Sequence, residues 1–158
     1  MMTAKKEKTA ILFIGIQGCG KSWYYDHFLA QEFEHINLDT LHTRNKERIA
    51  IEEAIYYGRN IVIDNTNPTK EDRQRYIPMF RAAGYRIEGY FFESRVQDCI
   101  RRNAQRTGKA RVPNTAIAAT SNKLELPSKE EGFDSLYFIA REGETIMKRT
   151  EWREQHEL

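Results

Sequence analysis

An apolar stretch that breaks into glycines and ends on Lys-Ser constrains the fold of this chain more than any other part of its sequence. Residues 10–15 (AILFIG) are mostly branched or aromatic with little alternation, which predicts a strand buried on both faces. Residues 21–32 have a helical pattern, so the glycines lie between a strand and a helix. The run from Gly15 to Ser22, GIQGCGKS, matches G-x-x-x-x-G-K-[ST]. This pattern predicts a loop that binds phosphate groups.

The residue types in this loop suit that chemistry. Glycines allow backbone N–H groups to surround phosphates, and the N-terminus of the following helix adds a favourable dipole. Lys21 would contact the β and γ phosphates of a nucleotide, and the Ser22 hydroxyl would be a ligand of Mg²⁺. The alternative is a glycine turn that binds nothing, but a chance match in this setting is rare at average composition. The expected nucleotide-binding residues are Gly15, Gln17, Gly18, Cys19, Gly20, Lys21 and Ser22.

Strands and helices alternate along the rest of the chain. We expect further strands at 35–38, 59–64, 86–92 and 135–140, and helices at 44–57, 69–83, 95–106 and 113–124. Thr69 with Asp72, and Ser94 with Gln97, have the pattern of capping boxes, and Pro78 should kink the helix that contains it. The alternation predicts an α/β fold of the P-loop NTPase class, with a five-stranded, mainly parallel sheet flanked by helices on both faces.

The length of the chain favours one domain. We expect a single domain over residues 1–158, with a core at about 10–140 and a C-terminal extension at 141–158 that forms a docked helix or a partly loose tail. No signal peptide or membrane span is expected, and Cys19 and Cys99 suggest no disulfide framework, so we expect a cytoplasmic protein. The net charge of +2 neither requires nor excludes a nucleic-acid partner. The oligomeric state stays open.

Two aspartates follow predicted strands, at the edge of a parallel sheet where ligands bind. Asp64 ends the apolar run IVID, a Walker B-like position where a carboxylate can hold Mg²⁺. Asp39 follows a different strand and is placed to accept a proton from an attacking hydroxyl. Each could instead be a helix N-cap or a turn residue. The metal candidates are therefore Ser22 and Asp64, and Asp39 is the candidate base.

A basic segment follows the fourth predicted strand. Residues 95–111 contain six arginines and lysines against one aspartate. Arg102 and Arg106 are four residues apart and would share a helix face. The flexible sequence after them, TGKARVP, would allow the segment to close as an arginine-rich lid that neutralises charge on a transferring phosphoryl group. A solvated helix face is the alternative, but a phosphate loop in the same small domain favours the lid.

The combination of GIQGCGKS, INLDT, IVIDNTNPT, RNAQRTGKARVP and LPSKEEGFD resembles the kinase domain of phage and animal polynucleotide 5′-hydroxyl kinases, over residues 10 to 140 or so. Members of that family transfer the γ-phosphate of ATP to the 5′-OH of DNA or RNA. The resemblance implies a P-loop kinase fold, with Lys21 and Ser22 as contacts of ATP and Mg²⁺. It also implies Asp39 as the general base and Arg106, supported by Arg102, as the lid arginine.

Two departures from the family lie on the acceptor side. Leu38 stands where many members have an arginine directly before the aspartate. His42 stands where phage members have an arginine that binds the acceptor's phosphate, and Arg44 could substitute from nearby. The candidate substrate-binding residues are Asp39, His42, Arg44, Asp64 and Asn65.

The expected partners are ATP and a nucleic acid, DNA or RNA, without a membrane. Three alternatives to the 5′-OH reaction stay open. The acceptor could be the hydroxymethyl group of a modified base such as 5-hydroxymethyluracil. The chain could be a small-molecule kinase on the same scaffold, or a nucleotide-dependent switch with no specific acceptor.

Overall fold

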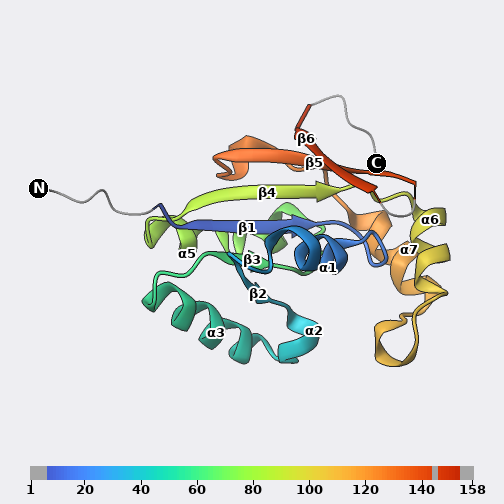
Figure 1. Cartoon of the computed structure of the whole chain (residues 1–158), viewed down its shortest axis with the longest axis horizontal. Helices are drawn as coiled ribbons and strands as arrows, with labels where there is room; N and C mark the ends of the chain where they lie inside the picture. The colour runs from blue at the N-terminus through green and yellow to red at the C-terminus, as the bar shows by residue number, and fades with distance from the viewer. Residues whose placement is uncertain (1–6, 144–145, 154–158) are drawn as a thin grey trace, which may run out of the picture.

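A mostly parallel sheet carries the fold in the computed structural model, which describes residues 7–143 and 146–153. Within these residues one six-stranded sheet has the order β2-β3-β1-β4-β5-β6 (Figure 1). Its strands are β1 (Thr9–Ile14), β2 (Glu34–Ile36), β3 (Ile61–Ile63), β4 (Arg86–Phe92), β5 (Ser135–Glu142) and β6 (Ile146–Glu151). The first five are parallel, and β6 pairs antiparallel with β5. The predicted α/β fold is confirmed, with one strand more than expected.

The central strands are buried as their apolar runs predict. Ala10 to Ile14 of β1 are at most 1% exposed, and so are all three residues of β3. Side chains on both faces of these strands must therefore be apolar, which explains the lack of alternation in the sequence. In Figure 1 the arrow of β4 points toward α6 and α7, which marks the carboxyl edge of the sheet.

Most helices lie at the expected positions with shorter bounds, but residues 38–41 form a helix that was not expected. They are α1 (Lys21–Tyr24), α2 (Leu38–Leu41), α3 (Arg44–Tyr56), α4 (Lys70–Gln74), α5 (Ile77–Ala82), α6 (Val96–Asn103) and α7 (Asn114–Lys123). The predicted helix at 21–32 is α1 continued by a π-helical turn, Tyr25–Leu29. None of the helices that the structure describes is long and apolar enough to cross a membrane.

The helix predicted at 69–83 is broken into α4 and α5. Thr69 and Asp72 do form a capping box at the start of α4. Pro78 lies in the first turn of α5, where its missing N–H costs nothing, so it helps to begin a second helix and does not kink one. Between the two helices, the buried Tyr76 turns its ring into the core.

The capping box predicted from Ser94 and Gln97 is wrong. The Ser94 hydroxyl donates to the carbonyl of Phe92 at 2.7 Å and accepts a hydrogen bond from the N–H of Ile16 at 3.3 Å. Helix α6 begins after Arg95, with no side-chain cap. Ser94 therefore fixes the phosphate loop to the end of β4, because its hydroxyl has a better partner across the sheet edge than along its own helix.

The C-terminal extension is neither a docked helix nor a loose tail over its described part. Residues 146–151 form β6, which runs antiparallel along β5. Charged side chains are common on such edge strands, which explains why the sequence of this segment does not look like a strand. Met147 is buried, and the Trp152 ring lies 5.3 Å from that of Phe91. Residues 154–158 of the predicted extension lie outside the described residues.

Candidate active site

The phosphate loop joins β1 to α1 in the shape that its glycines allow. Gly18 and Gly20 have φ angles of +84° and +93°, which side chains other than glycine rarely adopt. A Cβ at Gly18 would lie 2.5 Å from the carbonyl oxygen of Cys99 in α6. A Cβ at Gly20 would lie 2.7 Å from the guanidinium of Arg141 in β5. Two elements from the second half of the chain therefore press against the loop.

Lys21 lies at the start of α1 and folds back over the loop. Its ammonium donates to the carbonyl oxygens of Gly15 and Ile16, both at 2.9 Å, and the residue is 9% exposed. A buried ammonium needs such acceptors. The charge is thus held inside the loop, where phosphate oxygens could replace the two carbonyls.

Gln17 connects the loop to α7. Its side-chain amide donates to the Thr120 hydroxyl at 3.1 Å, and its buried Oε1 has no hydrogen-bond partner among the described residues. Cys19 is buried and its sulfur lies 3.5 Å from the Lys21 ammonium. Both cysteines of the chain are free. Burial raises the pKa of the Cys99 thiol to about 12, so this thiol is a packing group beneath the loop.

Ser22 and Asp64, the two metal candidates, are in direct contact. The Ser22 hydroxyl donates to Oδ2 of Asp64 at 2.8 Å, and Nε2 of His35 lies 2.6 Å from the same oxygen. Asp64 is 1% exposed, and a carboxylate so buried needs partners of this kind. His35 is a member of the site that sequence reasoning missed, since nothing near it in the chain marks it.

The pair fits Mg²⁺. This ion is usually held by one or two protein oxygens together with substrate phosphates and water, and a hydroxyl beside a carboxylate supplies that minimum. No group of three or more His, Cys, Asp or Glu that could hold a metal ion occurs among residues 7–143 and 146–153. The donor set therefore suits a metal that arrives with a nucleotide.

Asp39 lies in the short helix α2, which two asparagines tie to the end of β3. Asn37 caps the helix, accepting from the N–H of Asp39 at 2.8 Å, and donates to the carbonyl of Asp64 at 2.8 Å. Asn65 accepts from the N–H of Leu38 at 2.9 Å. The Asp39 side chain is exposed, and its carboxylate makes no hydrogen bond or ion pair with any residue that the structure describes. Asp39 is thus an unengaged carboxylate on a fixed backbone.

The predicted second strand ends earlier than expected. It was expected to reach residue 38, but β2 ends at Ile36, and Asp39 is in a helix. The reason is the side chain of Asn37, which accepts from two backbone N–H groups and begins α2. Asp39 still follows the carboxyl edge of the sheet, as predicted.

Arg44 and His42 lie just beyond Asp39. His42 ends α2 with a φ of +70° and is exposed. Arg44 opens α3, and its guanidinium donates to the Glu47 carboxylate at 3.0 Å and to the Tyr76 hydroxyl at 2.8 Å. Both candidates for the acceptor's phosphate are therefore on the side of the site that carries Asp39.

Glu47 is a further residue that the sequence did not reveal. It is 2% exposed and accepts from the Asn65 amide at 2.9 Å and from the Tyr76 hydroxyl at 3.0 Å, besides Arg44. Because the Asn65 nitrogen donates to Glu47, its oxygen is turned toward Leu38. Burial, with the Glu47 charge next in size, raises the pKa of Tyr76 to about 12. The network of Arg44, Glu47, Tyr76 and Asn65 supports α2 through the hydrogen bond that the N–H of Leu38 donates to Asn65.

The two predicted lid arginines are not on one helix face. Helix α6 ends at Asn103, so Arg106 lies in the loop beyond it and donates to the carbonyl of Ala110 at 3.4 Å. Arg102 donates from Nε to the carbonyl of Gly18 at 2.6 Å, so it does contact the phosphate loop. The prediction of a helix to residue 106 is wrong: α6 ends at Asn103, and the side chain of that residue closes the loop that follows.

That loop, 104–111, is closed at its base by one side chain. Asn103 is fully buried; it accepts from the N–H of Val112 at 3.0 Å and donates to the carbonyl of the same residue at 2.6 Å. The loop begins and ends at this pair, beside the phosphate loop that Arg102 touches. These two hydrogen bonds fix the base of the loop, which is called the flap from here on.

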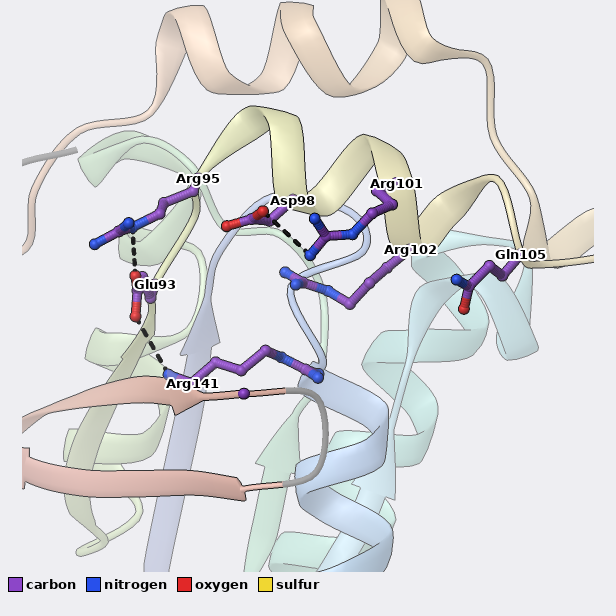
Figure 2. A pocket seen from close by; sticks show the side chains of 8 residues that line it. Glu93, Arg95, Asp98, Arg101, Arg102, Gln105 and Arg141 are labelled. Atoms are coloured by element: carbon purple, nitrogen blue, oxygen red, sulfur yellow. Dashed lines mark hydrogen bonds and ion pairs between the residues drawn. The ribbon is translucent and has the colours of Figure 1, made fainter.

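A cavity of about 460 Å³ opens beside the phosphate loop, between α6 and β5 (Figure 2). Arg102 and Arg141 reach toward it from opposite walls (Figure 2). Glu93 accepts from the N–H of Arg141 at 3.2 Å and pairs with Arg95 at 2.6 Å. The volume of the cavity is in the range of small-ligand sites. Basic groups thus line the space next to the loop.

Comparison with known proteins places the chain in a family. Residues 11–127 match the family model AAA_33, described as an AAA domain. The chain is similar to the bifunctional polynucleotide phosphatase/kinase of Schizosaccharomyces pombe, with 28% identity over 130 residues, which are 80% of this chain and 32% of that protein. It is 29% identical over 138 residues to a putative bifunctional polynucleotide phosphatase/kinase of Acanthamoeba polyphaga mimivirus, over 83% of this chain and 33% of that protein.

The chain spans about a third of the length of these curated relatives. The crystal structure of Chaetomium thermophilum Kti12 in complex with ADP-AlF3 has a similar fold, with a TM-score of 0.66 and 13% identity over 86% of this chain and 91% of that one. The resemblance to polynucleotide kinases that the motifs predicted is confirmed by the two relatives. The chain therefore belongs to the AAA_33 family of AAA domains, and its fold is that of the P-loop kinases.

Proposed function

We propose that this protein is an ATP- and Mg²⁺-dependent kinase that transfers the γ-phosphate to the 5′-OH of a polynucleotide. A phosphotransferase of the nucleic-acid kinase type is what the family and the two relatives support in general. The observation that carries the finer proposal is the placement of Asp39. Its carboxylate is unengaged, while Asn37 and Asn65 hold the backbone N–H groups of Asp39 and Leu38 beside the end of β3, where Asp64 contacts Ser22.

The donor side of the reaction rests on the phosphate loop. Backbone N–H groups of the loop and the Lys21 ammonium would hold the phosphates of ATP, and Arg102 is fixed at the loop to add a second cation. Ser22 and Asp64 would hold Mg²⁺, which neutralises charge on the β and γ phosphates when it is bound.

The acceptor side rests on Asp39. The oxygen of the acceptor hydroxyl forms a bond to the γ-phosphorus while the bond from that phosphorus to the leaving ADP oxygen breaks, and Asp39 takes the hydroxyl proton. The exposure of its carboxylate leaves room for a nucleotide end. Arg106, on the flap closed by Asn103, would reach the transferring group when the flap moves over the loop.

A transfer assay with three matched oligonucleotides tests the proposal. With γ-labelled ATP we expect label to enter an oligonucleotide with a free 5′-OH. An oligonucleotide with a 5′-phosphate should stay unlabelled, and so should a third that also carries an internal 5-hydroxymethyluracil. Label in the third alone would assign the base hydroxymethyl group as acceptor and contradict the 5′-OH proposal. A rate of ATP hydrolysis that none of the three oligonucleotides changes would indicate a nucleotide-dependent switch.

The role of Asp39 is tested with a matched pair of variants. Asp39→Asn should lower the rate of transfer at least about a hundredfold, as expected for loss of a general base, while ATP binding is unchanged. Asp26→Asn changes an exposed aspartate on the π-helical turn and should leave transfer at the wild-type rate. Full activity of Asp39→Asn would show that another group accepts the proton.

A further inference from the structure

A second groove lies between α3 and the α4–α5 pair, away from the nucleotide cavity. Its volume is about 430 Å³. Three basic residues, Arg44, Arg48 and Arg75, share its walls with Tyr76, and Ile51 and Met79 are among its apolar lining residues. No step of the proposed reaction uses this groove, so its composition needs an explanation.

The groove is connected to the segment of the candidate base by one side chain. The Tyr76 hydroxyl, in its wall, accepts from the Asn65 amide at 3.1 Å. The oxygen of the same amide accepts from the N–H of Leu38, the residue before Asp39. One asparagine side chain therefore separates the groove from the backbone that carries Asp39. This short connection places the groove beside the segment that carries Asp39.

The exposed charge of the groove is positive. Glu47 is buried behind Arg44, so its carboxylate neutralises a guanidinium that is still 48% exposed. Arg48 is 55% exposed and contacts Glu52 and Asn45 along its own helix. These contacts leave part of each guanidinium open to a ligand.

Arg75 is the third basic residue, at the end of α4. It is exposed, and within the described ranges its guanidinium has no hydrogen bond or ion pair. Arginines are suited to bind phosphate groups, because the fork of N–H donors fits two oxygens at once. The groove therefore offers phosphate-binding groups from two different helices.

The lining also offers a surface for a base. Met79 is partly buried and leaves some apolar surface exposed, whereas Ile51, at 1% exposed, offers a ligand almost none. Proteins that bind single strands combine a positively charged groove for the backbone with flat or apolar groups for the bases, and arginine planes can serve as well. The volume of the groove is in the range of a site for one small ligand, so a single nucleotide fits it.

We propose that this groove binds the nucleotide that follows the 5′-terminal nucleotide of a single-stranded acceptor. Arg44 then faces the first internucleotide phosphate, and Arg48 and Arg75 hold the next phosphate. The inference rests on the proposed function and extends it: an acceptor strand of at least two nucleotides fills the whole site, and a nucleoside 3′-phosphate is an acceptor that occupies only part of it.

The test compares a long and a short acceptor. The double variant Arg48→Ala/Arg75→Ala is assayed with a 5′-OH octathymidylate and with thymidine 3′-monophosphate. We expect the KM for the octamer to rise about tenfold, with kcat and the KM for ATP unchanged. The KM for the mononucleotide should stay at its wild-type value. The slope of log(kcat/KM) for the octamer against log[salt] should become shallower by about 0.7, as expected for the loss of one phosphate contact on a single strand.

A matched control and a binding measurement complete the test. Arg59→Ala removes a partly exposed arginine that precedes β3, at the opposite edge of the sheet, and should change none of these values. A 5′-phosphorylated octamer, which cannot react, should bind the double variant about tenfold more weakly than it binds the wild type. Unchanged thermal melting of the double variant will show that it is folded.

The outcomes separate the two proposals. Equal losses with both acceptors, or no loss with the octamer, overturn the groove proposal while wild-type transfer to 5′-OH ends upholds the kinase. If the wild type transfers phosphate to neither acceptor, the kinase proposal fails and the groove proposal fails with it.

Discussion

Glu47 gives the sharpest prediction, because it is buried, charged and contacts three donors from three segments. Replacement by alanine leaves the Arg44 guanidinium, the Asn65 amide and the Tyr76 hydroxyl without their common acceptor. Breaking a buried ion pair costs about 3–5 kcal/mol. Arg44 is 48% exposed and can bind water in place of the carboxylate, so we expect the lower end of this range, about 3 kcal/mol.

This loss should be visible in thermal unfolding. In a chain of this size, 1 kcal/mol lowers Tm by about 2–4 °C, so Glu47→Ala should melt about 6–12 °C below the wild type. Asn65 also loses the partner that turns its oxygen toward Leu38, so the helix that carries Asp39 loses an anchor. We therefore expect kcat of the proposed transfer to fall while ATP binding is retained.

A surface glutamate on the same helix is the control. Glu52 is 56% exposed and pairs with Arg48, and such exposed pairs contribute about 0.5 kcal/mol or less. Glu52→Ala should therefore melt within about 2 °C of the wild type. If Glu47→Ala melts in the same range as Glu52→Ala, the network does not stabilise the fold and the reasoning is wrong.

Three other predictions follow from single side chains. The pKa of Tyr76 is raised from 10.0 to about 12, so its contribution to stability is complete below pH 10 and is lost as the pH rises to 12. In urea titrations between these pH values, Tyr76→Phe should therefore lose about 2–3 kcal/mol less stability than the wild type. Asn103→Ala removes both bonds to Val112, so protease should cut the loop at 104–111 faster and transfer should slow, with ATP still bound. Gly20→Ala forces a side chain into a φ of +93° and against Arg141, so it should abolish nucleotide binding measured by calorimetry. The control Gly84→Ala, at a distant glycine with a φ of +80°, should still bind the nucleotide.

The phosphate loop and the central strands could be predicted because their signals are local. The apolar run of β1 and the glycines after it lie side by side in the chain, and the backbone angles of Gly18 and Gly20 follow from the motif. Ser22 and Asp64 were both predicted as metal candidates, and the structure brings them into direct contact after neighbouring strands of the sheet. The resemblance to a family added the role of Asp39, which stays a prediction.

The parts that could not be predicted depend on contacts between distant segments. Glu47 reads as one of several charges on a surface helix, and only Tyr76 and Asn65, brought by other elements, make it a buried acceptor. His35 reaches Asp64 across two strands. Strand β6 has the composition of an exposed segment, and it pairs because β5 offers a free edge. In each case the deciding partner is far away in the sequence.

The pairing of β5 with β6 has a consequence for how the protein folds during its synthesis on the ribosome. A Cβ at Gly20 would meet Arg141 at 2.7 Å and the sulfur of Met147 at 3.3 Å, so one wall of the nucleotide site comes from the last described strand. The loop itself precedes that strand in the sequence and is therefore synthesised before it. Contacts this distant in sequence form late, because a long segment must be ordered before they appear. A growing chain therefore carries its phosphate-binding motif long before it has the wall that completes the site.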